Sequence, residues 1–290
     1  MRNLEQERSA AALVEIEHLS FAYGKGQRLA LDDVTLTVHH GDFLGIIGES
    51  GAGKTTLGHC MNGVVPHYYK GDYYGSVKVN GEDVFDLQIT DIARVLGTVG
   101  QDVDGQMVAA VVEDELLYGL ENFGVPADEI ESRLARALSE VGIVDLRHRE
   151  IATLSGGQKQ KVALAALLAL RPCALLLDEP TAELDPQSSV QVFDLLRALN
   201  ERGVTVVVIE QKVMLLAEYA RRLVVMDRGS VALSGSVDEV FSQVDRMVAL
   251  GVNCPRVSLL TYELGRRGVE CGGVSRTVEE AALRIEEVLA

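Results

Sequence analysis

One stretch of nine residues constrains the fold of this chain more than any other. Residues 48 to 56 read GESGAGKTT, directly after the apolar run FLGII and before a segment of helical pattern. The stretch matches the pattern G-x-x-x-x-G-K-[ST], whose glycines let successive backbone N–H groups turn inward around an anion. The N-terminus of the following helix adds partial positive charge. A merely flexible loop is the alternative, but it would not need a strand before it and a helix after it.

This loop is expected to bind a nucleoside triphosphate together with Mg²⁺. Lys54 is expected to reach the β- and γ-phosphates, and the Thr55 hydroxyl is expected to be a Mg²⁺ ligand. The predicted phosphate-binding residues are Gly48, Glu49, Ser50, Gly51, Ala52, Gly53, Lys54, Thr55 and Thr56.

The order of predicted elements indicates an α/β fold. The first third reads as short strands with turns, among them SVKVNGEDV, where Asn80-Gly81 is typical of a hairpin. Residues 108 to 142 have a helical pattern, which Gly142 is expected to end. Helices from about residue 157 to 170 and from Pro186 to Gly203 then alternate with the apolar runs ALLLD and VTVVVIE. This alternation predicts a mainly parallel sheet that is covered on both faces.

Residues 236 to 290 are expected to form a small helical appendage. Ser236 with Glu239, and Thr277 with Glu280, have the spacing of capping boxes. The final helix should dock on a neighbouring element, because one stripe of it is apolar. That stripe consists of Val278, Ala281, Ala282, Ile285 and Leu289.

Composition excludes several classes of protein. The net charge is −16, from 43 acidic and 27 basic residues, so a broad nucleic-acid surface is not expected. The start of the chain lacks a long apolar run, and no segment reaches the about 20 apolar residues that span a bilayer. We therefore expect a cytoplasmic chain that meets a membrane through partners only.

The four cysteines have no metal-binding spacing and are expected to be reduced core thiols: Cys60, Cys173, Cys254 and Cys271.

The run ALLLDEPT ends an apolar segment on two adjacent acids, Asp178 and Glu179. Carboxylates at the end of a buried strand are costly unless a cation or a polar cleft compensates them. Asp178 is expected to hold Mg²⁺, and Glu179 to orient or deprotonate an attacking water. A pair of helix-capping acids is the alternative interpretation.

A second anion-binding helix end is predicted at LSGGQKQ, residues 154 to 160. Ser155 is a good N-cap, and Gly156 and Gly157 leave the first amides of the helix bare. One phosphate loop does not need two such helix ends. A composite site accounts for the surplus, since this helix end could cap a nucleotide held by another chain. Taken alone, the stretch also fits an ordinary glycine-rich helix start.

A phosphate loop, then LSGGQ, then LLLDEPT, then AELD, in that order, resembles the nucleotide-binding subunit of ATP-binding-cassette (ABC) transporters. The resemblance covers residues 13 to 235 and implies a P-loop NTPase of ABC type. It implies an antiparallel β subdomain, a mainly parallel α/β core, and an inserted helical subdomain at about residues 101 to 170. It also implies ATP as the nucleotide and a second ATPase, identical or homologous, as partner.

The resemblance assigns roles to further residues. Tyr23 would stack on adenine, Gln101 would contact Mg²⁺ and the attacking water, and Asp185 would lie at the dimer interface. The LSGGQ residues that would meet the partner's nucleotide are Ser155, Gly156, Gly157 and Gln158. Taken alone, Tyr23 also fits a surface aromatic residue and Gln101 a solvated loop residue.

A narrower resemblance is to the ATPases of energy-coupling-factor transporters, which take up vitamins and transition metals. It rests on VGQDVDGQMVAAVVEDELLYGLEN and on the segment VFSQVDRMVALGVNCPRVSLLTYELGRRG. It implies transmembrane coupling and substrate-binding partner proteins, with Gln106 and Met107 where coupling contacts are made. A plain loop-to-helix junction is the alternative for these two residues. This chain departs from the subgroup's Phe-Gln-Asn-Pro, because residues 100 to 103 read GQDV.

The strand TVVVIEQK ends on Gln211, where the family usually has a histidine that touches the γ-phosphate. Glutamine can donate a hydrogen bond, but it cannot carry charge or relay a proton near neutral pH. We therefore hypothesise that this chain's site binds ATP well and hydrolyses it slowly, while a partner ATPase carries most turnover. The alternative is that glutamine substitutes adequately.

These features together predict an ATPase that powers uptake of a small nutrient from the inner face of the cell membrane. Alternatives are a soluble ABC ATPase acting on DNA or ribosomes, and the ATPase of a conventional ABC importer. The first usually has coiled-coil insertions or two cassettes, which this chain lacks. Export is disfavoured because exporters commonly fuse the cassette to a membrane domain.

Overall fold

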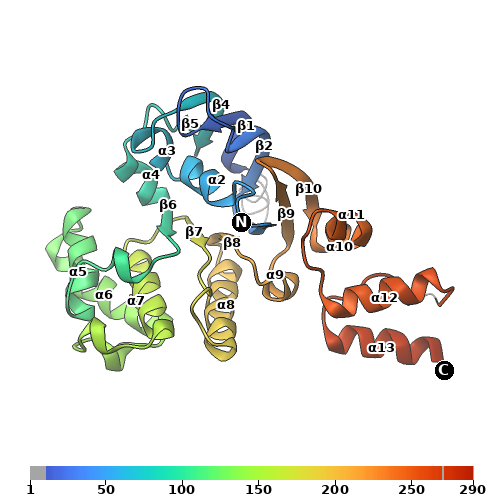
Figure 1. Ribbon diagram of the computed structural model, residues 1–290. Coiled ribbons are helices and arrows are strands. Elements are labelled where there is room, and N and C mark those ends of the chain that lie inside the picture. The colour runs from blue at the N-terminus through green and yellow to red at the C-terminus, as the bar shows by residue number, and fades with distance from the viewer. Residues whose placement is uncertain (1–10, 270, 290) are drawn as a thin grey trace.

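Two β-sheets and a lobe of helices form the architecture (Figure 1). A computed structural model describes residues 11–269 and 271–289. The smaller sheet is antiparallel, has the order β2-β1-β4-β5, and consists of β1 (Ala12–Ala22), β2 (Leu31–His39), β4 (Asp72–Val79) and β5 (Glu82–Asp83). The larger sheet has the order β10-β9-β3-β8-β7-β6 and consists of β3 (Phe43–Gly48), β6 (Leu96–Val99), β7 (Ala174–Asp178), β8 (Thr205–Ile209), β9 (Arg222–Asp227) and β10 (Ser230–Ser236).

The larger sheet is parallel from β9 to β6, and only β10 pairs antiparallel. This confirms the predicted antiparallel and mainly parallel parts. The helices of the first part are α2 (Lys54–Met61), α3 (Val64–His67) and α4 (Ile89–Val95). The 3₁₀ turn η1 (Asp104–Gln106) then leads to the helical lobe, which consists of α5 (Val112–Asn122), α6 (Ala127–Val141) and α7 (Gly156–Ala169). The remaining helices are α8 (Pro186–Glu201), α9 (Val213–Tyr219), α10 (Val237–Phe241), α11 (Val244–Ala249), α12 (Arg256–Arg266) and α13 (Val278–Leu289).

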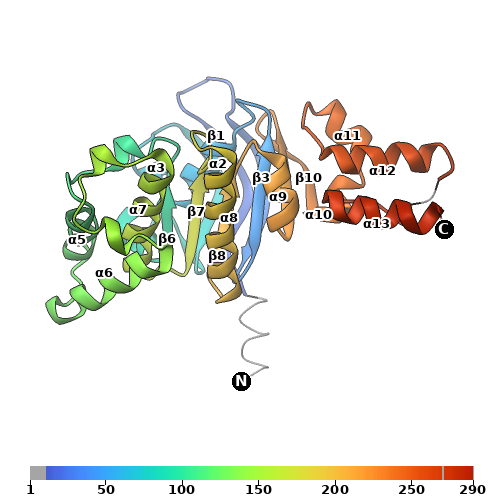
Figure 2. The same cartoon turned by 90° about the horizontal axis from the view of Figure 1, so that it is seen from below.

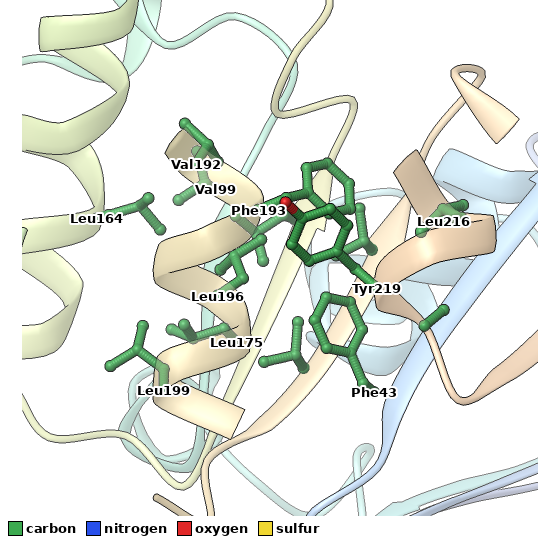
Figure 3. Close-up of a cluster of buried hydrophobic side chains, with 14 of the residues drawn as sticks. Phe43, Val99, Leu164, Leu175, Val192, Phe193, Leu196, Leu199, Leu216 and Tyr219 are labelled. Carbon is green, nitrogen blue, oxygen red and sulfur yellow. The ribbon is translucent and has the colours of Figure 1, made fainter. Parts of the chain in front are cut away.

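The larger sheet separates two hydrophobic cores. Along β8, Val206 and Val208 face one core and Val207 and Ile209 the other, because successive strand residues point to opposite faces. Helices α8 and α9 and the helical lobe cover the first face, and Figure 3 shows how their side chains meet. There the ring of Phe193 lies 6.4 Å from that of Phe43 and 5.3 Å from that of Tyr219. This sheet is therefore the rigid base from which the site residues project.

Several turns and caps form as the sequence predicts. Asn80 and Gly81 have φ of 51° and 82° and join β4 to β5 as a hairpin. Gly142, with φ of 70°, ends α6. Ser236 and Glu239 form a reciprocal capping box at the start of α10. The second box is wrong in one half, because the Glu280 carboxylate accepts from the backbone N–H of Arg276 and not from that of Thr277.

The C-terminal helices α12 and α13 lie side by side at the far side of β10 from the helical lobe (Figures 1 and 2). The predicted stripe on α13 is only partly covered. Ala281 is buried and Ile285 half-buried, whereas Val278 and Leu289 are 64% and 80% exposed and Ala282 is also exposed. The final helix does dock on a neighbouring element as predicted, since α13 packs against α12, but this contact covers only the middle of the stripe. By contrast, α10 buries its apolar residues in the larger core.

All four cysteines are free, but they are not all in the core. Cys60 and Cys271 are buried, Cys254 is half-buried and Cys173 is exposed. The prediction is wrong for Cys173 because it lies in the short turn before β7, at the surface end of the strand. Within residues 11–269 and 271–289, no helix is both long and apolar enough to cross a membrane.

Candidate functional site

The phosphate loop joins β3 to α2 as predicted, and its glycines are required by the backbone. Gly48 has φ of 153°, and a Cβ there would lie 2.3 Å from the carbonyl oxygen of Met226 on the neighbouring strand β9. Gly53 has φ of 99°, in a region that side chains disfavour. The loop can therefore wrap its amides inward only because these positions lack side chains.

Lys54 lies across the mouth of this loop. Its Nζ donates hydrogen bonds to the carbonyl oxygens of Gly48 and Glu49, both at 2.9 Å, and the residue is 5% exposed. Burial lowers the pKa of the ammonium, while the nearby carboxylates Glu179 and Asp178 oppose that shift. The lysine is thus positioned at the loop that would hold the phosphates.

Asp178 ends β7 beside the first turn of α2. The residue is 8% exposed, and both Thr55 and Asp178 line the same cleft. Burial raises the pKa of Asp178, and the nearby Thr55 hydroxyl opposes that shift. Among the described residues its Oδ1 has no hydrogen-bond partner, although it is buried. A cleft of about 250 Å³ on the Glu179 side and one of about 190 Å³ on the Thr55 and Asp178 side flank this strand end.

The unpartnered Oδ1 and the adjacent hydroxyl fit a small, hard cation. Mg²⁺ prefers oxygen ligands and is commonly held by one or two protein oxygens together with phosphates and water. The described residues contain no group of three or more His, Cys, Asp or Glu that could hold a metal alone. Thr55 and Asp178 would therefore hold Mg²⁺ jointly with the phosphates.

Glu179 is held by amides from two other strands. The Gln101 Nε2 donates to its Oε2 at 3.1 Å, and the Gln211 Nε2 donates to its Oε1 at 2.5 Å. These residues follow β6, β7 and β8, which are neighbours in the sheet, so their carboxyl ends meet at one edge. Glu179 has φ of 50°, which is uncommon for a residue with a side chain. The three predicted catalytic residues are thus brought together.

Tyr23 lies next to the helix of the phosphate loop. Its hydroxyl is 3.0 Å from Thr56 Oγ1, and the residue is 41% exposed. Its ring meets Phe21 and Tyr69 edge-on, with centroids 5.0 and 5.5 Å away. The ring is therefore fixed and partly open, as a stacking surface requires, and its role stays a prediction.

The second predicted helix end lies apart from the phosphate loop. Ser155 and Gln158 form a capping box at the start of α7, which belongs to the helical lobe, whereas α2 lies by the smaller sheet (Figure 1). Gly156 and Gly157 occupy the first turn. Asp185 is the N-cap of α8, where its carboxylate accepts from the Ser188 backbone N–H at 3.0 Å. Hydrogen bonds from Ser188 lower the pKa of Asp185.

The two predicted coupling residues are placed differently from each other. The exposed Gln106 accepts from the Gly100 backbone N–H at 3.2 Å, so this hydrogen bond joins two residues within the loop after β6. Met107 is half-buried and packs against the larger core. Met107 therefore has a packing role here, and coupling contacts by either residue stay a prediction.

The sequence did not single out Thr181 and Lys212, which contact each other beside Glu179. Lys212 Nζ donates to the Thr181 carbonyl at 2.5 Å, and Glu210 Oε1 accepts from the Thr181 hydroxyl at 3.1 Å. The one sequence signal for these contacts is the pair of charged residues, Glu210 and Lys212, that flank Gln211 just after a buried strand.

Comparison with known proteins agrees with this geometry. The family model described as ABC transporter matches residues 31–182. The chain is 37% identical to the energy-coupling factor transporter ATP-binding protein EcfA1 of Clostridium novyi, over 92% of this chain and 95% of the relative. Among solved structures, cbiO1 from Clostridium perfringens, part of the ABC transporter complex cbiONQ, is 30% identical with a TM-score of 0.74, over 86% of this chain and 98% of that one. A dimeric, post-hydrolysis state of the cassette MJ0796 bound to ADP and Pi is 25% identical with a TM-score of 0.67, over 77% of this chain and 98% of that one.

The family match spans the phosphate loop, the helix end at Ser155 and the acids at the end of β7. The chain belongs to the ABC transporter family as an ATP-binding subunit, and it is an ATPase.

Proposed function

We propose that this ATPase powers uptake of a small nutrient, a vitamin or a metal ion, through a membrane complex. It would work on the inner face of the cell membrane, held there by transmembrane coupling and substrate-binding proteins. The support is the likeness to EcfA1 of Clostridium novyi and to cbiO1, which is described as part of a transporter complex. The cargo would be selected by the membrane partners.

The observation that carries the proposal is the separation, in one chain, of the two helix ends that are predicted to bind anions. The phosphate loop lies beside the smaller sheet and the start of α7 lies in the helical lobe (Figure 1). A nucleotide on the loop would therefore be capped by Ser155 to Gln158 of a second ATPase subunit. Two ATP molecules would be enclosed between two subunits, and closure would act on the membrane partners.

Each residue of the site would have a distinct role in hydrolysis. Lys54 and the loop amides would bind the phosphates, with Thr55, Asp178 and the Gln101 side chain near Mg²⁺. Mg²⁺, when bound, would offset the negative charge of the phosphates. Glu179 would accept a proton from the attacking water. The amides of Gln101 and Gln211 would orient the Glu179 carboxylate, as their hydrogen bonds do here.

The proposal also retains slow turnover at this chain's own loop. The Gln211 amide is neutral and already donates a hydrogen bond to Glu179, so it would stabilise the γ-phosphate less than a charged donor does. A partner ATPase with histidine at this position would then carry most of the turnover.

Affinity purification of the tagged chain from detergent-solubilised membranes tests the proposed function. We expect small, very hydrophobic proteins and a second ATPase subunit to co-purify in fixed ratio. The Lys54→Ala variant, in which we expect nucleotide binding to be impaired, is the control for nucleotide-dependent contacts. Recovery of ribosomal proteins or DNA in place of membrane proteins would overturn the proposal.

A further inference from the structure

Lys212 follows Gln211 and reaches a loop on the neighbouring strand. We call residues 181 to 185 the AELD loop, since they follow Pro180 and end at the N-cap of α8. The half-buried Lys212 donates from Nζ to the carbonyl oxygens of Thr181 and Leu184 at 2.5 and 3.4 Å. It also reaches the hydroxyl of Ser189, in the first turn of α8, at 3.2 Å. One ammonium thus contacts both ends of the AELD loop and the helix that follows.

Glu210, on the other side of Gln211, contacts the same loop. It is 1% exposed, and its Oε1 accepts from the Thr181 hydroxyl at 3.1 Å and from the Lys212 backbone N–H at 3.3 Å. Thr181 is fully buried. Both neighbours of Gln211 are therefore attached to the residue that lies two positions after Glu179.

This attachment has a consequence for Glu179. Its backbone, at φ of 50°, is in a region that persists only where the surroundings hold it. Its own N–H is bonded to the Ile209 carbonyl at 2.8 Å, and Thr181 is fixed from β8 by Lys212 and Glu210. The end of β8 thus holds the chain on both sides of the strained residue.

The far end of the AELD loop lies against the start of α7. A Cβ on Gly156 would lie 3.5 Å from Leu184 Cδ2, and a Cβ on Gly157 would lie 3.0 Å from the hydroxyl of Ser188. The loop therefore runs from Glu179 of this chain's own site to the helix end that, under the proposed function, caps the partner's nucleotide. Lys212 is bonded along that path.

We propose that Lys212 is a positioning residue that ties the AELD loop to the end of β8, so that Glu179 and the helix end at Gly156 move as one unit. The part of this proposal that concerns the helix end at Gly156 rests on the proposed function, because only a paired subunit gives that helix end a nucleotide to cap. The contacts of Lys212 Nζ are with Thr181, Leu184 and Ser189, so in this role it would touch neither ATP nor the attacking water. Its loss should therefore lower the rate of hydrolysis more than the affinity for ATP.

Lys212→Met tests the proposal, because it keeps a long apolar stem and removes every hydrogen bond from Nζ. We expect kcat to fall by about 10- to 100-fold, since small misplacements of a catalytic group have effects of that size, while KM changes by less than about threefold. Lys212→Arg should restore part of the rate. The matched control is Lys161→Met, since Lys161 is also half-buried and donates to Gln191 on α8 at 3.1 Å. It should leave kcat unchanged.

Two further measurements separate positioning from a general loss of structure. Ser189→Ala removes one hydrogen-bond acceptor of Lys212 and should lower kcat by less than Lys212→Met does. Its thermal unfolding midpoint should stay close to that of the wild type. ATP affinity in a Glu179→Gln background should be unaffected by Lys212→Met. An unchanged kcat in Lys212→Met, an equal loss in Lys161→Met, or a parallel loss of ATP affinity would each overturn the proposal. If the wild type hydrolyses ATP and forms pairs, and Lys212→Met has the same kcat, only the role of Lys212 is refuted. If the wild type never forms pairs, the proposed function is refuted as well.

Discussion

The Gln211 side-chain amide donates to the Glu179 carboxylate at 2.5 Å, from the opposite side to the amide of Gln101. In this state the residue that replaces the family's usual histidine therefore contacts the predicted catalytic base. A glutamine can orient that base, but it cannot carry positive charge. The expected consequence is correct alignment with weak stabilisation of the γ-phosphate.

Gln211→His should raise the rate of ATP hydrolysis at this chain's own site. We expect an increase of roughly two- to tenfold, because a charge-assisted hydrogen bond is about twice as strong as a neutral one. The measurement is single-turnover hydrolysis with enzyme in excess over ATP. Gln211→Asn, which keeps an amide but shortens its reach, is the control and should not gain rate. If the histidine variant turns over no faster, glutamine already serves as well, and slow turnover is not a property of this site.

Stability should depend on pH through Glu210. Burial raises the pKa of its carboxyl, while bonds from the Lys212 backbone and Thr181 oppose that shift. A raised folded-state pKa gives stability that is present below the unfolded pKa, about 4.3, and is lost as pH rises through the folded value. Glu210→Gln should therefore gain stability relative to the wild type between about pH 4.5 and pH 8. Urea unfolding at both pH values checks this, and a constant difference would contradict it.

Core packing around Phe193 should dominate the stability of the larger core. Its ring is fully buried between Phe43 and Tyr219 (Figure 3). Phe193→Ala should lower the free energy of unfolding by about 3–5 kcal/mol. Val190→Ala on the same helix, at a position 42% exposed, should change it by less than about 0.5 kcal/mol. Equal effects of the two substitutions in chemical denaturation would show that the cluster is not the core of this face.

Local signals predicted the parts of the fold that depend on few neighbours. The phosphate loop, the hairpin at Asn80 and the cap at Ser236 each need only residues within a few positions of one another. Periodicity predicted that α13 docks on a neighbour, but it does not show how much of an apolar stripe that neighbour covers. Cys173 was misjudged for a related reason, since the chemistry of cysteine does not show where a turn meets solvent.

Individual site residues could be predicted from the sequence only where they lie in a recognisable motif. The resemblance to a known family placed Gln101, Glu179 and Gln211 together, although 78 and 32 positions separate them. The contacts of Lys212 with Thr181 and Ser189 belong to no motif, because they follow from the order of strands in the sheet. The sequence therefore identified the predicted catalytic residues that lie together in the structure, but not the residues that hold them in place.

Pairing over nucleotide is the central claim, and Glu179→Gln tests it most directly. This substitution should slow hydrolysis by about 10²- to 10⁴-fold, so that bound ATP persists. Light scattering after size exclusion, with ATP and Mg²⁺, should then show a pair of subunits that retains two ATP molecules. Without nucleotide, the same chain should elute as a single subunit. If no pair forms with ATP and Mg²⁺, either with itself or with an ATPase that co-purifies from its own cells, the composite site does not exist.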